Sequence, residues 1–201
     1  MKQYLIKSMD KKDFSKANTA EICNFQWMDN GYEPKTQAWV VFVAGEGFHV
    51  RLRSYEKNPK ATYKNYMDHV CEDACMEFFF NFKPENGDTY INFEANPLGT
   101  LNSSVGEGRH GRRPVKEWWG TLPEITATVE EDYWQLEYCL DLERLEKVFG
   151  KINTEKGAKY RGNFYKCGDE TDFEHYGIWN PVNREKPDYH CPDQFGELVM
   201  D

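Results

Sequence analysis

Polar side chains alternate with apolar ones in the short segment TYINFEANP, residues 89 to 97. Asn92, Glu94 and Asn96 stand at every second position, so in a β-strand all three would project from one face. Their amide and carboxyl groups supply planar donors and acceptors for hydroxyl groups, and Arg53 would add a bidentate donor. The row therefore favours a site for a neutral, hydroxyl-rich molecule such as a sugar. The alternative is a solvated row on the outer side of a β-sandwich.

Motifs of catalytic chemistry are absent from the chain. It contains no G-x-S-x-G, no glycine-rich phosphate loop before a helix and no H-E-x-x-H. Paired carboxylates can hydrolyse a glycosidic bond, and Glu77, Glu94 and Glu137 could converge on one sheet face. Glutamates on a strand face are more often solvated or hydrogen-bonded, so a small glycoside hydrolase is the second hypothesis.

The cysteines and histidines do not form a diagnostic metal motif. Cys71 and Cys75 are four residues apart without a second close pair, so a zinc site would need distant partners such as His190 or Cys191. Free thiols are expected, and His175 and His190 are interpreted as hydrogen-bonded structural residues. Calcium prefers clustered carboxylates. Candidates without diagnostic spacing are Glu56, Asp68, Glu72 and Asp73.

Length and charge bound the class of protein. The 201 residues fit a single domain, residues 1–201, and a formal charge of −9 argues against nucleic-acid or anionic-membrane partners. The basic cluster Gly108 to Pro114 is interpreted as a solvated loop.

The amino end has no apolar run of signal-peptide length, which predicts a cytoplasmic protein as written, or an extracellular one if a leader was removed. The oligomeric state stays open.

The dominant hydrophobic period is two residues, which indicates β-strands. Residues 38–44 and 48–54 flank a glycine-containing turn and predict a hairpin. Only residues 141–150 look helical, with Asp141 as N-cap and Gly150 as the end. We therefore expect an all-β protein, an antiparallel β-sandwich of jelly-roll or immunoglobulin-like kind with one short helix. Further predicted strands cover residues 74–82, 89–97, 124–129, 133–140, 160–167 and 196–200.

Three segments in order resemble carbohydrate-binding module family 9, more closely its family 9-like branch. They are NYMDHVCEDACMEFFFNF, TYINFEANPLGTL and the C-terminal GIWNPV with PDYHCPDQFGELVM. The resemblance covers the chain from about Val40 to its end. It implies a non-catalytic β-sandwich that binds the end of a glucan- or xylan-type saccharide between two aromatic rings, and well-studied members also bind calcium.

The resemblance also assigns residues to the binding site. Glu77 matches a ligand-facing glutamate, Asn92 and Glu94 match polar positions on the next strand with Asn96 beside them, and Tyr189 matches a stacking tryptophan. Trp179 either shapes the pocket or plugs the end of the sandwich. Cys71 stands where the second stacking ring is expected. Four aromatic residues are candidates to replace that ring: Tyr63, Tyr66, Trp118 and Trp119. A third hypothesis is an interaction module that has lost its sugar.

Overall fold

Two β-sheets form the body of the molecule, in a computed structural model that describes all residues 1–201. The first sheet has the order β8 (Arg113–Pro114), β7 (Leu101–Gly106), β6 (Tyr90–Ala95), β5 (Cys75–Asn81), β11 (Lys159–Gly168) and β13 (Gly196–Met200), with β12 (His175–Ile178) also beside β11. The second has the order β3 (Thr36–Val43), β4 (Gly47–Ser54), β10 (Trp134–Asp141) and β9 (Ile125–Val129), with β2 (Ala20–Ile22) beside β3.

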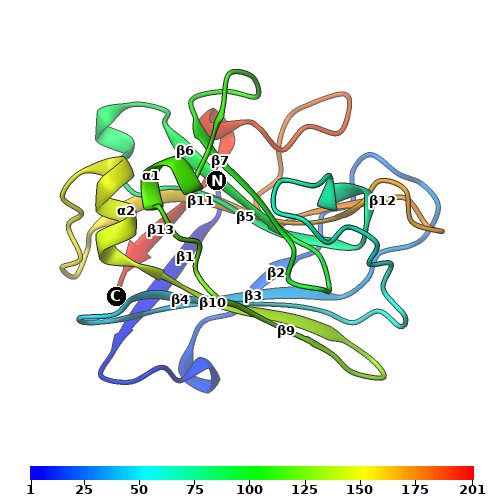
Figure 1. The fold of residues 1–201 in the computed structure, drawn as a ribbon, viewed down its shortest axis with the longest axis horizontal. Coiled ribbons are helices and arrows are strands. Elements are labelled where there is room, and N and C mark those ends of the chain that lie inside the picture. Colours follow the sequence, from blue (N-terminus) through cyan, green and yellow to red (C-terminus); the bar gives the residue numbers. More distant parts are fainter.

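Strand β1 (Gln3–Met9) belongs to both sheets. Residues 3–6 pair in parallel with β13, and residues 7–9 pair in parallel with β3. All other strand pairs are antiparallel. In Figure 1 the strands β5, β6, β7 and β11 lie above β3, β4, β9 and β10, which gives the two layers of a sandwich and confirms the predicted fold class.

The main core lies between the two sheets, because alternate residues of each strand point inward. On β5 the side chains of Met76, Phe78 and Phe80 enter this core, and Phe78 stacks on Phe164 with ring centroids 4.6 Å apart. On β4 the inward set includes Val50 and opposes an outward row of His49, Arg51 and Arg53, as the alternation predicts.

The helices are short and lie at one end of the sandwich. The predicted helix is confirmed as α2 (Leu142–Phe149), where the Asp141 carboxylate accepts a hydrogen bond from the Arg144 backbone N–H at 2.9 Å and Gly150 ends the helix. A one-turn helix, α1 (Lys116–Trp119), packs against α2 and was not predicted. The chain also has four short 3₁₀ helices, at Phe14–Lys16, Val70–Glu72, Pro84–Asn86 and Pro192–Gln194. None of these helices is long and apolar enough to cross a membrane.

The predicted hairpin is confirmed as β3 and β4. Gly47, the first residue of β4, has φ +137°, and a Cβ atom there would lie 2.3 Å from the carbonyl oxygen of Leu140. A glycine is therefore required where β4 runs closely beside β10. Strands β1, β2, β7, β8 and β12 were not predicted.

A second apolar cluster covers the outer face of the first sheet. Phe79 on β5, Tyr165 on β11 and Tyr90 on β6 point away from the main core, toward the C-terminal segment that carries Tyr189 and Phe195. This segment folds back over the sheet, so the outer face of β5 and β6 is covered by the chain itself. The candidate site lies at the edge of this cover.

Candidate functional site

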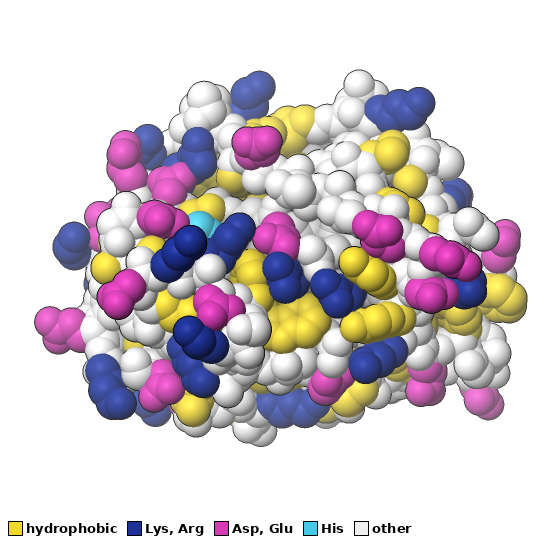
Figure 2. Space-filling model, turned by 90° about the horizontal axis from the view of Figure 1, so that it is seen from below, with side chains coloured by type: hydrophobic (Ala, Val, Ile, Leu, Met, Phe, Trp, Pro, Cys, Tyr) yellow, Lys and Arg dark blue, Asp and Glu magenta, His cyan; other side chains and the backbone are white.

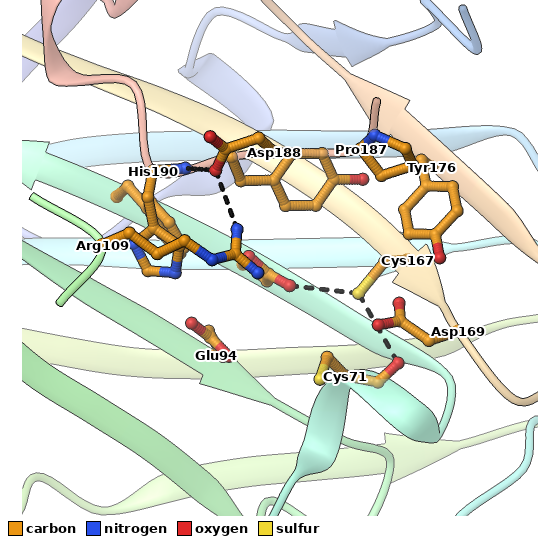
Figure 3. A pocket seen from close by; sticks show the side chains of 12 residues that line it. Cys71, Glu94, Arg109, Cys167, Asp169, Tyr176, Pro187, Asp188 and His190 are labelled. Carbon is orange, nitrogen blue, oxygen red and sulfur yellow. Dashed lines mark hydrogen bonds and ion pairs between the residues drawn. The ribbon is translucent and has the colours of Figure 1, made fainter. Parts of the chain in front are cut away.

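A pocket of about 170 Å³ opens on the outer face of the first sheet (Figure 3). The strands β5, β6 and β11 form its floor, and the C-terminal segment forms one wall. Its charged and ionisable lining consists of Glu77, Glu94, Asp169, Asp188, Arg109 and His190. The rest of its lining consists of Cys71, Cys167, Phe79, Tyr176, Pro187 and Tyr189.

The two floor glutamates come from directly opposed positions of neighbouring strands. Glu77 on β5 pairs in register with Glu94 on β6, so both side chains leave the same face of the sheet. Both are buried, Glu77 with 2% and Glu94 with 8% of its surface exposed. The solvated-row alternative is therefore wrong for Glu94, and also for Asn92 and Asn96, which are 3% and 0% exposed.

Glu77 has only one hydrogen-bond partner for its two carboxyl oxygens. The Cys167 thiol donates to Oε1 at 3.1 Å, whereas Oε2 is buried without a partner. Burial, and next the charge of Glu94, raise the pKa of Glu77 well above its usual value. A buried oxygen without a partner costs free energy, which a ligand donor in the pocket would recover.

Glu94 is held by an amide that is itself fixed. The Asn92 Nδ2 group donates to Glu94 Oε1 at 2.8 Å, and the Asn92 Oδ1 atom accepts from Arg112 Nη2 at 2.7 Å and from the Ser104 backbone N–H. Burial raises the pKa of Glu94 to about 7, although the Asn92 hydrogen bond opposes this shift. Asn92 does not line the pocket. It positions Glu94 from the neighbouring place on the same face of β6.

A third carboxyl group and an ion pair complete the polar lining. Burial raises the pKa of Asp169 to about 6. At the rim the Arg109 guanidinium lies 2.9 Å from Asp188, and the Arg109 side chain is 55% and the Asp188 side chain 30% exposed. His190 is hydrogen-bonded to the Tyr90 hydroxyl, and burial lowers its pKa to about 4, so its ring is neutral near neutral pH. Figure 3 shows the Arg109–Asp188 pair on one side and Cys167 with Asp169 on the other.

The aromatic wall differs from the one expected. Tyr189 lines the pocket but is 8% exposed, because its ring stacks on Tyr165 at 4.0 Å and its other neighbour, Trp27, is 5.9 Å away. Its hydroxyl donates to the Lys166 backbone carbonyl at 3.0 Å. Tyr176 on β12 is partly exposed, lines the same pocket and meets Tyr189 edge-on. Tyr176 is therefore the ring available to a ligand.

Four of the predicted site residues lie outside the pocket: Asn92, described above, and Arg53, Asn96 and Trp179. Arg53 projects from the outer face of the second sheet, where it donates to Gln135 at 2.6 Å, so the whole core separates it from the pocket. Figure 2 views that side of the molecule and shows scattered charges around hydrophobic side chains. The Asn96 amide fixes a turn by accepting from the Thr100 backbone N–H. Trp179 packs edge-on against Phe164 in the main core and fills the end of the sandwich.

One of the three glutamates considered as paired carboxylates, Glu137, lies far from the other two on the opposite sheet. Glu137 lies on the outer face of the second sheet, bonded to Arg51 at 2.7 Å, and does not converge with Glu77 and Glu94. The four rings considered as substitutes at the Cys71 position do not line the pocket.

The carboxylates considered for calcium do not assemble into a calcium site. Glu56 is paired with Lys166 at 2.9 Å, and Asp73 accepts hydrogen bonds from Thr62 and Tyr63. Asp68 accepts from backbone N–H groups of its own turn, and Glu72 accepts from the Tyr63 hydroxyl. One cluster, Cys75, Glu77 and Cys167, brings three ligand atoms within 4.8 Å of one another. Two buried sulfurs and one carboxyl group do not suit calcium, which takes six to eight oxygens.

Several pocket residues were missed by sequence analysis. Arg109 belongs to the basic cluster interpreted as a solvated loop, and Asp169 and Tyr176 follow β11 in a segment without a motif. The sequence signal at Tyr176 was an aromatic residue directly after the polar pair Glu174 and His175. Nothing in the sequence placed it opposite Glu77.

The chain resembles known proteins in sequence pattern and in fold. The model described as carbohydrate-binding family 9 matches residues 7–200. A candidate carbohydrate-binding protein from Bacteroides uniformis has 24% identity and a TM-score of 0.82, with 100% of this chain and 99% of that chain covered. No curated protein matches the chain.

Two further structures are of one family 9 module from Caldicellulosiruptor kristjanssonii. Its complex with glucose has 8% identity and a TM-score of 0.68, covering 100% of this chain and 96% of that one. Its complex with cellotriose has 8% identity and a TM-score of 0.67, covering 99% and 93%. Because the family model spans nearly the whole chain, the protein belongs to carbohydrate-binding family 9, and its function is non-catalytic carbohydrate binding.

Proposed function

We propose that the protein binds the end of a glucan- or xylan-type saccharide, with one terminal sugar ring in the pocket above Glu77 and Glu94. The observation that carries this proposal is the unpartnered Oε2 atom of Glu77, buried at the floor of an open pocket that Tyr176 borders. A sugar hydroxyl can donate to this oxygen and accept from a protonated carboxyl beside it.

The size and walls of the pocket support a single ring. About 170 Å³ is smaller than the roughly 300–1,000 Å³ of sites for drug-sized molecules. Tyr176 offers a face for the apolar C–H side of the ring, and Glu77, Glu94 and Asp169 offer hydroxyl partners. The rest of a chain would leave past the exposed Arg109–Asp188 pair.

Calorimetry with glucose, xylose, cellotriose and xylotriose tests the proposal. Because only the end ring enters the pocket, a monosaccharide and its trisaccharide are expected to bind with affinities within about tenfold of each other. Glu94→Ala should weaken binding about tenfold, since it removes a buried polar partner. Glu137→Ala is the matched control, because it removes a strand glutamate on the other sheet and should leave binding unchanged.

The outcomes separate the competing functions. Absence of heat with every sugar would contradict the proposal and favour an interaction module. Release of dye from chromogenic glycosides that Glu77→Gln abolishes would favour a hydrolase.

A further inference from the structure

The pocket holds three carboxyl groups that no cation neutralises. Glu77, Glu94 and Asp169 line it, and none of them forms an ion pair. The one cation in the lining, Arg109, is already paired with Asp188 at the rim. The ring of His190 is neutral because burial lowers its pKa to about 4.

Two further cations near the pocket, Arg112 and Lys166, also have partners within the protein. Arg112 lies over the Tyr90 ring on the outer face of the sheet and donates to Asn92, to the Tyr90 carbonyl and to the Ser104 carbonyl. Lys166 points from β11 to the opposite face of the sheet, where its Nζ atom contacts Glu56 at 2.9 Å and His175 at 2.6 Å. Neither forms an ion pair with a carboxyl group of the pocket, although Arg112 lowers the pKa of Glu94 and Lys166 lowers that of Glu77 through their charges, so the acidic lining is left for a ligand.

The available hydrogen-bond donors within the protein are weak or few. Glu77 receives one bond from the Cys167 thiol and Glu94 receives one from Asn92. Glu77 Oε2 receives none, although it is buried. An ammonium group carries three donors and no acceptor, and its charge favours the ionised form of the three carboxyl groups, so it matches their oxygens better than a hydroxyl group does.

We propose that this pocket prefers a sugar ring that carries an ammonium group, as an amino sugar does near neutral pH, over the corresponding neutral ring. This inference rests on the proposed function, because the ring itself is held as described above. The ammonium group lies toward Glu77 and Asp169, and the remaining hydroxyl groups face Glu94.

The charge of the pocket gives the preference a defined pH dependence. The pKa of Asp169 is about 6 and that of Glu94 about 7 in the free protein, both raised first by burial, and burial also raises the pKa of Glu77 well above its usual value. Other charged groups act on them: Glu174 and Glu72 raise the pKa of Asp169, whereas Arg109 lowers it and Arg112 lowers that of Glu94. A bound ammonium favours the ionised carboxyls, so its binding releases protons and strengthens as the pH rises through 6 and 7.

Calorimetry on the unmodified protein with glucose, glucosamine and N-acetylglucosamine tests the inference. At about pH 7.5 glucosamine should bind about tenfold tighter than glucose, because hydrogen bonds to charged groups are about twice as strong as neutral ones. At about pH 5 the ratio should fall to about threefold or less, since the carboxyls are protonated. N-Acetylglucosamine, which is neutral, should bind no tighter than glucose.

A pair of variants separates the charge from the shape of the pocket. Asp169→Asn should reduce the glucosamine-to-glucose ratio at about pH 7.5 by about threefold or more. Asp172→Asn, an exposed carboxylate on the same loop, should leave the ratio unchanged. Both readouts are ratios, so a general loss of affinity does not mimic the effect.

Three results would overturn the inference. Binding of glucose without preference for glucosamine at about pH 7.5 would overturn it and leave the proposed function intact, whereas absence of binding to all three sugars would overturn both. Binding of calcium or zinc ions alone, with a glucosamine preference that a chelator abolishes, would assign the acidic lining to a metal instead.

Discussion

At the residue scale, the site depends on carboxyl groups that are buried yet open to one pocket. Glu77 and Glu94 face each other across β5 and β6, and their ring partner is Tyr176. Alternation along each strand predicted that both glutamates leave the sheet on the side opposite to the core. It could not predict Tyr176, because its place depends on how the chain after β11 returns as β12 and pairs beside β11.

The exposed ring gives the first prediction at this scale. Tyr176→Ala should weaken sugar binding about fivefold, since a stacked ring contributes about 1 kcal/mol beyond its buried area. Calorimetry measures the change, and Tyr133→Ala serves as the control because that ring lies under Arg53 on the second sheet. Equal losses in the two variants would contradict a role for Tyr176 in the site.

Protonation of Glu94 gives a second prediction. Its pKa rises from 4.5 to about 7 on folding, so between these values the folded state binds more protons than the unfolded state. The free energy of unfolding therefore decreases as the pH rises through this range. Glu94→Gln removes the titrating group, so the melting temperature of the variant relative to the unmodified protein should increase from about pH 5 to about pH 8. A constant difference would contradict the buried carboxyl.

At the element scale, turns and caps set where the strands meet. The 38–54 hairpin and the helix at 141–150 were predictable, because glycine turns and an aspartate N-cap are local signals. Strand β1 was not predicted, because its pairing in parallel with β13 and β3 joins the two ends of the chain. Such distant pairing leaves no local pattern.

The glycine at the start of β4 gives a prediction for this scale. Gly47→Ala should lower the free energy of unfolding by about 2 kcal/mol or more, because the added Cβ would meet the Leu140 carbonyl oxygen and the φ of +137° disfavours alanine. Urea denaturation measures it. Gly108→Ala is the matched control, since nothing lies within 4 Å of its Cβ position. A similar small loss in both would contradict the close approach of β4 and β10.

At the scale of the whole molecule, a buried ion pair links the two sheets. Lys166 on β11 is fully buried and lies 2.9 Å from Glu56, which follows β4, and the Trp134 Nε1–H on β10 donates to the same carboxylate at 2.8 Å. The fold class follows from strand patterning. This link does not, because a buried lysine cannot be recognised in a strand without its partner.

The link predicts a large change in stability. Lys166→Met should lower the free energy of unfolding by about 3–5 kcal/mol, because it leaves Glu56 buried without its cation. The double variant Lys166→Met with Glu56→Gln should recover part of this loss, which denaturant titration would show. An additive or larger loss in the double variant would contradict the pairing.

The most direct test of a sugar site above Glu77 and Glu94 is a crystal structure of the protein with cellotriose. We expect a terminal sugar ring beside Tyr176, with its hydroxyl groups within hydrogen-bond distance of Glu77 and Glu94. The remaining rings should leave the pocket past Arg109. A saccharide bound instead on the outer face of the second sheet, with the pocket empty, would contradict it.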